Sequence, residues 1–187
     1  MLDAETIMRA TEDVLRRHGP SKATVVDVAR ALGVSHAAVY RHFPSKAALR
    51  EAVTRRFVGR SLPALAAIAG DEALAPPERL RAWLSEMFAS KRALASSDPE
   101  LFATYRVLAE EHNAVASEHV AALLEQLESM VAAGFASGDF TGTDAAAAAR
   151  TVFWASAAFH HPALAAEWSR REDAFADVCT LIVNGLR

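Results

Sequence analysis

The segment VSHAAVYRHFPSK, residues 34–46, decides the fold of this chain. It follows Gly33, which permits a sharp turn, and Ser35 is placed to act as the N-cap of a short helix. In a helix of about two turns, Val39 and Phe43 lie one turn apart on the buried face. Most of the polar side chains then point outward. We therefore expect a short helix with an apolar inner face and a polar outer face.

The elements on either side of this segment also have helical patterns. A helix over about residues 3–18 ends at RRHGP, where basic residues, a glycine and a proline form a stop signal. A helix over about residues 25–32 has an apolar stripe at helical spacing, with Thr24 as its N-cap. Pro44 ends the short helix, and Ser45 caps the next one. This order predicts a three-helix helix-turn-helix domain, whose last short helix can enter the major groove of DNA.

The outer face of the short helix has the side chains that DNA recognition needs. Ala37 and Ala38 allow close approach to base edges and can contact a thymine methyl group. Tyr40 and Lys46 are placed to bind phosphates, and the helix N-terminus at Ser45 suits a phosphate oxygen. We expect this face to contact double-stranded DNA.

Residues 24–53, TVVDVARALGVSHAAVYRHFPSKAALREAV, resemble the DNA-binding domain of the TetR family of bacterial transcriptional repressors. The shared features include Asp27, the LGVS turn and Leu49, all in fixed register. The resemblance implies that residues 36, 37, 40 and 42 lie at the DNA and that residue 46 contacts a phosphate. Positions 37 and 38 depart from the family, where Gly and a hydroxyl residue are frequent. The residues assigned to the DNA-binding surface are Thr24, Ser35, His36, Ala37, Ala38, Tyr40, Arg41, His42 and Lys46.

The rest of the chain repeats the helical spacing of apolar residues, without the alternation typical of strands. We predict an all-α protein of about nine helices. The segment GDEALAPPE at 70–78 is the predicted linker. Residues 1–57 would form the helix-turn-helix domain, with a linking helix over about 45–69, and residues 70–187 a second helical domain. Its helices are expected at about 78–96, 99–111, 113–136, 144–160 and 173–186.

Composition and charge restrict the class of protein. No apolar run reaches the ~18 residues of a membrane span, and the N-terminal sequence lacks the pattern of a signal peptide, so we expect a cytoplasmic protein without membrane contact. Residues 1–60 hold 11 Lys and Arg against 6 Asp and Glu, whereas residues 61–187 hold 9 against 17. A basic first third suits a polyanionic partner.

Metal and catalytic sites are not expected. His112 and His119 are two helical turns apart, about 10.5 Å, which is too far to share one ion without other ligands. His160 and His161 are interpreted as helix-surface histidines. Cys179 is the single cysteine and lies in the middle of a predicted helix, where an inert buried thiol is expected. We therefore expect neither an enzyme nor a cofactor.

For the second domain, the TetR resemblance implies ligand binding and homodimerisation. Large side chains mixed with many alanines can line a cavity for a small-molecule effector, and polar groups among them can orient it. The residues proposed for the ligand site are Trp83, Met87, Phe88, Lys91, Phe102, Tyr105, Arg106, His119, Phe153 and Trp154. Those proposed for the dimer interface, on the last two long helices, are Val152, Ala157, Phe175, Val178, Ile182 and Leu186.

Two functions fit this sequence. The first is a ligand-responsive repressor that binds a palindromic operator as a dimer and is released by a small, mainly apolar effector. The alternative is an architectural or division-linked DNA-binding factor that shares the N-terminal domain but has no effector. A single operator upstream of its own gene, rather than many scattered sites, would favour the repressor.

Overall fold

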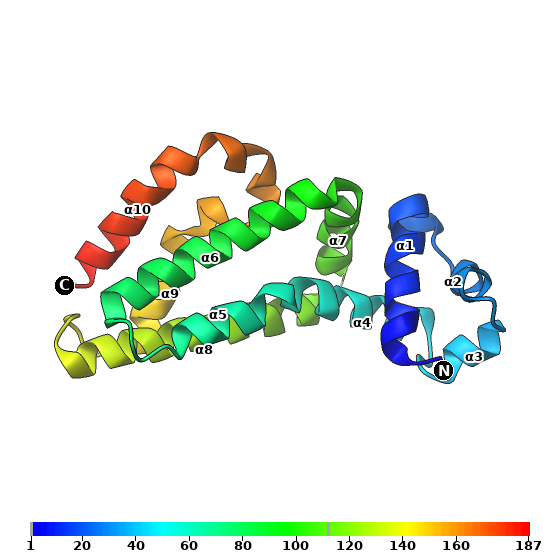
Figure 1. The fold of residues 1–187 in the computed structure, drawn as a ribbon, viewed down its shortest axis with the longest axis horizontal. Helices are drawn as coiled ribbons and strands as arrows, with labels where there is room; N and C mark the ends of the chain where they lie inside the picture. The colour runs from blue at the N-terminus through cyan, green and yellow to red at the C-terminus, as the bar shows by residue number, and fades with distance from the viewer. Residues whose placement is uncertain (1, 112) are drawn as a thin grey trace. The chain divides into compact units, whose positions relative to one another are not determined.

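The computed structural model describes residues 2–111 and 113–187 and is helical throughout (Figure 1). The described residues form ten α-helices, three 3₁₀ segments and no strand, which confirms the all-α prediction. The α-helices are α1 (Ala4–Lys22), α2 (Val25–Leu32), α3 (His36–Tyr40), α4 (Lys46–Val58), α5 (Leu62–Ala69), α6 (Pro76–Ser97), α7 (Pro99–Glu111), α8 (Asn113–Ser137), α9 (Ala145–Ala155) and α10 (Glu172–Gly185). The 3₁₀ segments are η1 (Gly59–Ser61), η2 (Ala157–Phe159) and η3 (Pro162–Arg170).

The chain packs into two compact units, which are described separately. The first unit comprises residues 1–59 and 98–119, and the second comprises residues 60–97 and 120–187. The first unit therefore holds α1 to α4, α7 and the first turns of α8. The second holds α5, α6, the remainder of α8, α9 and α10. Segment 98–119 joins the first unit although about forty residues separate it from α4 along the chain.

Capping side chains set the helix boundaries of the first unit. Thr24 and Asp27 form a reciprocal capping box at the start of α2, and Ser35 and Ser45 each accept a backbone N–H at the starts of α3 and α4. The predicted stop of the first helix is confirmed, because Gly19 leaves the helical conformation with φ of +71°. Gly33 ends α2 in the left-handed conformation, with φ of +66°, which a side chain would strain.

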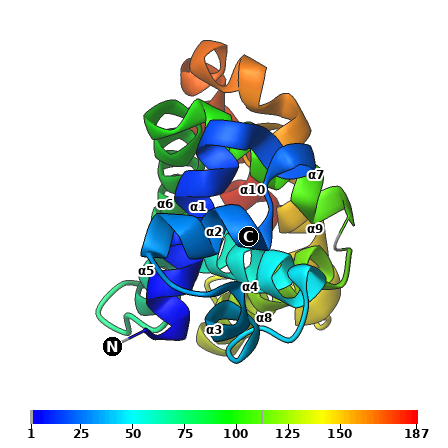
Figure 2. The ribbon, with the colours of Figure 1, turned by 90° about the vertical axis from the view of Figure 1, so that its right-hand side faces the viewer.

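The core of the first unit forms where α1 packs against α2, α4 and α7 (Figures 1 and 2). The helices bury the apolar stripes that the sequence predicted, including the inward pair from the short helix, Val39 and Phe43. Each such side chain contributes about 1.5–3 kcal/mol when fully buried. The core residues of α1, α2 and α4 are Ile7, Val14, Leu15, Val25, Val28, Ala29, Leu49, Val53 and Phe57.

Two predicted helices are shorter than expected. The third helix has five residues rather than two full turns, because the residue before Pro44 disfavours the helical conformation and the chain turns at residues 41–42. The helix predicted over 144–160 ends at Ala155. There the Ser156 hydroxyl donates to the carbonyl oxygens of Val152 and Phe153, at 3.0 and 3.1 Å, an arrangement that competes with regular helix continuation. The chain continues in the 3₁₀ segments η2 and η3.

The second unit is built around Trp83 of α6, whose side chain is fully buried. Its indole N–H donates to the side-chain oxygen Oε1 of Gln126 on α8 at 2.8 Å, so the polar atom of this large side chain is satisfied. Within the described residues, no helix is long and apolar enough to cross a membrane. The surrounding core cluster includes Leu65, Leu80, Leu84, Met87, Leu123, Leu127, Met130, Phe140, Ala149, Val152, Phe153, Cys179 and Val183.

Candidate nucleic-acid interface

The outer face of α3 carries exposed polar and small side chains, as predicted. His36, Ala37 and Arg41 are exposed, and 41% of the Tyr40 side chain is accessible. His36 and Tyr40 lie one turn apart with their ring centroids 6.3 Å from each other and their planes at 89°. This edge-to-face contact orients both rings on the same side of the helix. The face can therefore present two hydrogen-bonding rings to a groove.

The outward orientation expected for Ala38 is wrong. Only 9% of Ala38 is exposed, because α3 is a single turn and its middle residue faces the core beside Val39. The methyl group of Ala37 remains exposed and is the one that can contact a base. His42 is exposed in the turn after α3.

Groups suited to phosphates flank this face. Lys46 is exposed at the first position of α4, directly after the Ser45 cap, whose hydroxyl oxygen accepts from the Ala48 N–H at 3.0 Å. The Ser35 hydroxyl oxygen accepts from the Ala38 N–H at 3.2 Å, and a hydroxyl that accepts in this way can still donate its own hydrogen. A cation and a helix N-terminus together favour a phosphate oxygen.

Thr24 has a structural role in this interface. Its hydroxyl donates to the Asp27 carboxylate at 2.5 Å and accepts from the Asp27 N–H at 3.2 Å. The side-chain hydrogen bond from Thr24 is the main reason why the pKa of Asp27 is lowered. Asp27 in turn pairs with Arg30 at 3.1 Å. Thr24 thus holds the start of α2 in place rather than presenting an open hydroxyl.

A buried polar network joins α1, α4 and α7 within the first unit. Glu12 of α1 is only 6% exposed, and its carboxylate lies 3.6 Å from the Arg56 guanidinium of α4. The Tyr105 hydroxyl donates to the same carboxylate at 3.4 Å, and the Tyr105 ring stacks on Phe57 at 3.7 Å between centroids. Arg56 also pairs with Glu5 at 2.9 Å. These contacts fix the relative positions of the three helices.

This network was not predicted from the sequence. A signal was present, because Glu12 falls on the apolar side of the first helix, one turn from Met8 and from Leu15. A carboxylate at such a position needs a buried partner. The sequence does not reveal that partner, because it comes from α4 and α7.

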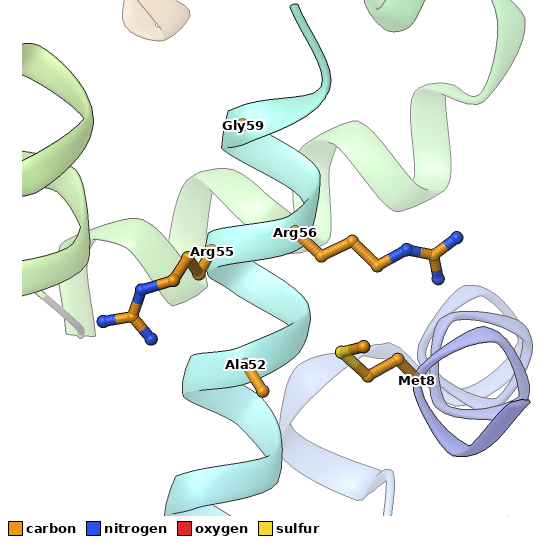
Figure 3. A pocket seen from close by; sticks show the side chains of 5 residues that line it. All are labelled: Met8, Ala52, Arg55, Arg56 and Gly59. Carbon is orange, nitrogen blue, oxygen red and sulfur yellow. The ribbon is translucent and has the colours of Figure 1, made fainter. Parts of the chain in front are cut away.

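A shallow hollow of about 440 Å³ lies between α1 and α4 in the first unit. Its lining combines apolar atoms with two guanidinium groups. Figure 3 shows Arg55 and Arg56 leaving α4 in opposite directions, with Arg56 extending toward the helix that carries Met8. Arg55 pairs with Glu51 at 3.1 Å and with Glu118 at 2.9 Å. Because both arginines already contact carboxylates, the hollow is a product of helix packing rather than an anion site. It is lined by Met8, Ala52, Arg55, Arg56 and Gly59.

The residues proposed for a ligand site are divided between the two units. Arg106 is exposed, and 61% of Trp154 is exposed, so neither side chain lies in the interior of its unit. His112, for which no shared metal site with His119 was expected, lies outside the described residues. The expectation of a surface histidine is wrong for His160, which is only 7% exposed and whose pKa is lowered to about 4 by that burial. The proposed residues in the first unit are Phe102, Tyr105, Arg106 and His119, and those in the second are Trp83, Met87, Phe88, Lys91, Phe153 and Trp154.

The residues proposed for a dimer interface lie partly in the core of the second unit. Val152 is 2% exposed, so it is buried within its own chain and is not open to a partner. Phe175, Ile182 and Leu186 are partly buried against the same core, whereas Ala157 and Val178 are half-buried. Among the described residues of α9 and α10, the exposed large apolar side chains are instead Trp154, at 61%, and Leu181, at 69%.

Three known proteins are similar to this chain, one in sequence and two in structure. Nucleoid occlusion factor SlmA of Vibrio cholerae is 42% identical over 59 residues, which are 31% of this chain and 30% of SlmA. FadR of Bacillus subtilis, in complex with stearoyl-CoA, superposes with a TM-score of 0.71 at 18% identity, over 99% of this chain and 100% of FadR. SmeT, the repressor of the Stenotrophomonas maltophilia multidrug efflux pump SmeDEF, superposes with a TM-score of 0.70 at 22% identity, over 97% of this chain and 90% of SmeT.

These relatives differ in what they share with the chain. The SlmA match spans less than a third of that protein, and the two structural matches show the fold alone. Family profiles cover more of the sequence. Residues 7–53 match bacterial regulatory proteins of the tetR family, and residues 76–179 match the tetracyclin repressor-like C-terminal domain. With an exposed helix-turn-helix face and matches in both parts, the chain belongs to the TetR family of bacterial transcriptional regulators.

Proposed function

We propose that this regulator is a ligand-responsive repressor that binds a palindromic operator as a homodimer. The observation that carries the proposal is the α3 face, where exposed His36 and Tyr40 are flanked by Lys46. The His36 ring suits a base edge, whereas the Tyr40 hydroxyl and the Lys46 ammonium suit backbone phosphates. Operator binding would exclude RNA polymerase from an overlapping promoter.

A dimer is required because a five-residue helix contacts too few base pairs to be specific alone. In a symmetric dimer, two such helices reach half-sites about 34–36 Å apart, or a multiple of that spacing. The exposed Trp154 and Leu181 on α9 and α10 support a partner surface there, since large apolar side chains are costly to leave in water. The contact would be isologous, as in most homodimers.

The effector would act by changing the spacing of the two recognition helices. It must bind the form that cannot span the operator more tightly, because equal affinity for both forms shifts nothing. A typical coupling of about 1–3 kcal/mol would weaken operator binding about 5–150-fold. FadR in complex with stearoyl-CoA and SmeT as an efflux-pump repressor support small-molecule control, because both share this fold.

The experiment is an operator search with purified protein. DNA upstream of its own gene is titrated in a gel-shift assay, and the protected region is mapped by footprinting. We expect one palindromic site with protection in two successive major grooves. Binding without sequence preference, or a protected site without two-fold symmetry, would contradict the proposal.

The match to SlmA favours a second candidate, a factor linked to nucleoid occlusion. SlmA is 42% identical to this chain over 59 residues. Mapping of binding sites across the genome distinguishes the two functions. A repressor occupies one or a few promoters, whereas a nucleoid factor occupies many dispersed sites. Dispersed occupancy that no compound relieves would replace the first candidate with the second.

A further inference from the structure

One arginine of α4 joins two segments that are distant in the sequence. The Nη2 atom of Arg50 donates to the Pro20 carbonyl oxygen at 2.9 Å, and the same atom lies 3.3 Å from the Glu111 carboxylate. Pro20 belongs to the turn between α1 and α2, residues 19–23, and Glu111 is the last residue of α7. A single nitrogen atom therefore connects α7 to the α1–α2 turn.

The surroundings of Arg50 make this connection depend on charge. Only 20% of its side chain is exposed, and its Nε atom is buried without a hydrogen-bond partner in the described chain. Burying a cation is costly unless an opposite charge lies close to it. The Glu111 side chain, which is 46% exposed, supplies that charge. Glu111 thereby stabilises the guanidinium in the place where it donates to Pro20.

The α1–α2 turn leads directly into the helix-turn-helix motif. Gly19 leaves the helical conformation there, and the Ala23 N–H donates to the Gly19 carbonyl oxygen at 3.2 Å. The next residue, Thr24, begins the capping box of α2. Since α2 has eight residues and α3 five, neither helix is stable without tertiary contacts. A contact that fixes this turn therefore also fixes the direction in which α2 and α3 follow it.

The position of α7 is itself well defined within the first unit. Segment 98–119 packs in the same unit as residues 1–59. In the middle of α7, the Tyr105 hydroxyl donates to the buried Glu12 carboxylate of α1. At its end, Glu111 pairs with Arg50. α7 thus provides a fixed point from which Glu111 can hold the arginine against the turn.

We propose that Arg50 is a positioning residue for DNA binding, through which Glu111 of α7 holds the α1–α2 turn. This inference rests on the operator binding of the proposed function and extends the DNA-binding module to α7. Without the ion pair the turn samples more conformations, and the cost falls on the complex that needs one orientation of α3. Binding to unrelated DNA tolerates several orientations, because it depends mainly on phosphate charge.

The first measurement compares preferred with unrelated DNA. The parent protein selects a preferred duplex from a random library, and fluorescence anisotropy gives the affinity of each full-length variant for that duplex and for an unrelated one. The ratio of the two affinities is the sequence preference. Glu111→Gln should lower it about three- to tenfold, within the usual range for coupling through packed side chains. Glu110→Gln, the same change at an exposed neighbouring position, is the matched control and should leave the ratio unchanged.

Variants of Arg50 test whether the arginine transmits the effect of Glu111. Arg50→Met should lower the preference at least as much as Glu111→Gln, and combining the two should cause no further loss. Arg50→Lys keeps the positive charge and should retain most of the preference. Losses that add in the double variant would show that Glu111 acts independently of Arg50, which contradicts the proposal. If circular dichroism shows that Arg50→Met is not folded, Arg50→Lys and the two glutamate variants still decide the question.

Hydrogen exchange in the free protein examines the turn itself. In Glu111→Gln, amide exchange should be faster in peptides that cover residues 19–28 and unchanged in the rest of the first unit. In Glu110→Gln, no peptide from this region should change. Faster exchange throughout the first unit of Glu111→Gln would show that the ion pair only stabilises the fold, and the positioning role would be wrong.

The outcomes separate the inference from the function on which it rests. If the parent prefers one duplex and Glu111→Gln keeps that preference, the positioning role is wrong and operator binding stands. A parent protein that selects no preferred duplex would remove the proposed operator binding and, with it, the role of Arg50 in sequence preference. A reduced preference in Glu111→Gln alone, together with local exchange at the turn, establishes α7 as part of the DNA-binding module.

Discussion

Arg16 and Asp98 are 82 residues apart in the sequence, yet their side chains meet in two charge-assisted contacts. The Arg16 Nε donates to Asp98 Oδ2 at 2.8 Å, and Nη2 lies 2.6 Å from the same oxygen. The other oxygen, Oδ1, accepts from the Leu101 N–H at 3.2 Å and so caps α7. A single carboxylate therefore starts α7 and binds it to the end of α1. Within the first unit, segment 98–119 is held against the helices that carry the DNA-binding face.

The two functions of Asp98 can be separated by substitution. Asp98→Ala removes both the cap and the ion pair and should lower the free energy of unfolding by about 1–2 kcal/mol. Asp98→Asn retains a good N-cap and loses only the charge, so it should cost about 0.2–1 kcal/mol. Urea denaturation measures both. Equal losses in the two variants would show that the cap contributes nothing.

Lys46→Ala should weaken binding to every DNA sequence by a similar factor. The ammonium group neutralises one phosphate, so its loss should lower the slope of log K against log salt by about one unit. Anisotropy titrations at several salt concentrations, with operator and unrelated DNA, provide the measurement. Arg106→Ala, which removes an exposed charge from α7, is the control and should leave the slope unchanged. A loss confined to the operator would assign Lys46 to base reading instead.

His36→Ala should relax sequence preference at one or two base pairs. The exposed ring contacts Tyr40 edge-to-face and presents its nitrogen atoms at the start of α3, so its loss removes base-edge contacts worth about 1–3 kcal/mol. Binding to a library of operators with single base changes would measure this. If affinity falls equally for all members, His36 contacts the backbone and not a base.

Acid should destabilise the fold through His160. Its pKa is about 4 in the folded chain and near 6.5 ordinarily, so between these values the unfolded chain binds a proton that the folded chain does not. Stability should therefore fall as pH drops from about 6.5 to about 4, by up to about 3 kcal/mol at about 1.36 kcal/mol per pH unit.

His160→Gln isolates this contribution, because an amide can still donate to the Phe153 carbonyl oxygen but does not titrate. Its unfolding free energy should change less between pH 6.5 and 4 than that of the parent. His42→Gln, at an exposed position, is the matched control and should keep the slope of the parent. A parallel profile for His160→Gln would show that the histidine is protonated without cost.

Leu181→Lys should disrupt the proposed homodimer, because it places a charge on the most exposed large apolar side chain of α10. We expect a monomer by sedimentation velocity at micromolar concentration and a large loss of operator affinity, since two half-sites are no longer bound together. Thr180→Lys adds the same charge at the neighbouring exposed position and should remain dimeric. A parent protein that sediments as a monomer would overturn the dimer proposal.

Much of the fold could be predicted from the sequence because its signals are local. Capping residues such as Thr24, Ser35 and Ser45 satisfy N–H groups two or three residues away, and Gly19 and Gly33 adopt conformations that other residues avoid. Apolar spacing within each helix then identifies its inner face. These features determined the all-α class, the boundaries of most helices and the exposed face of α3.

What depends on distant partners was decided only by the tertiary structure. Burial of Ala38, Glu12 and His160 follows from which helices surround them, and a single helix pattern cannot show this. The pairing of Arg16 with Asp98 joins residues whose local sequences give no sign of each other. The sequence by itself thus determined the helices and the DNA-binding motif, through interactions within a few residues. The tertiary structure decided which charges are buried and which segment supports α1 and α4, because those energies arise only when elements pack.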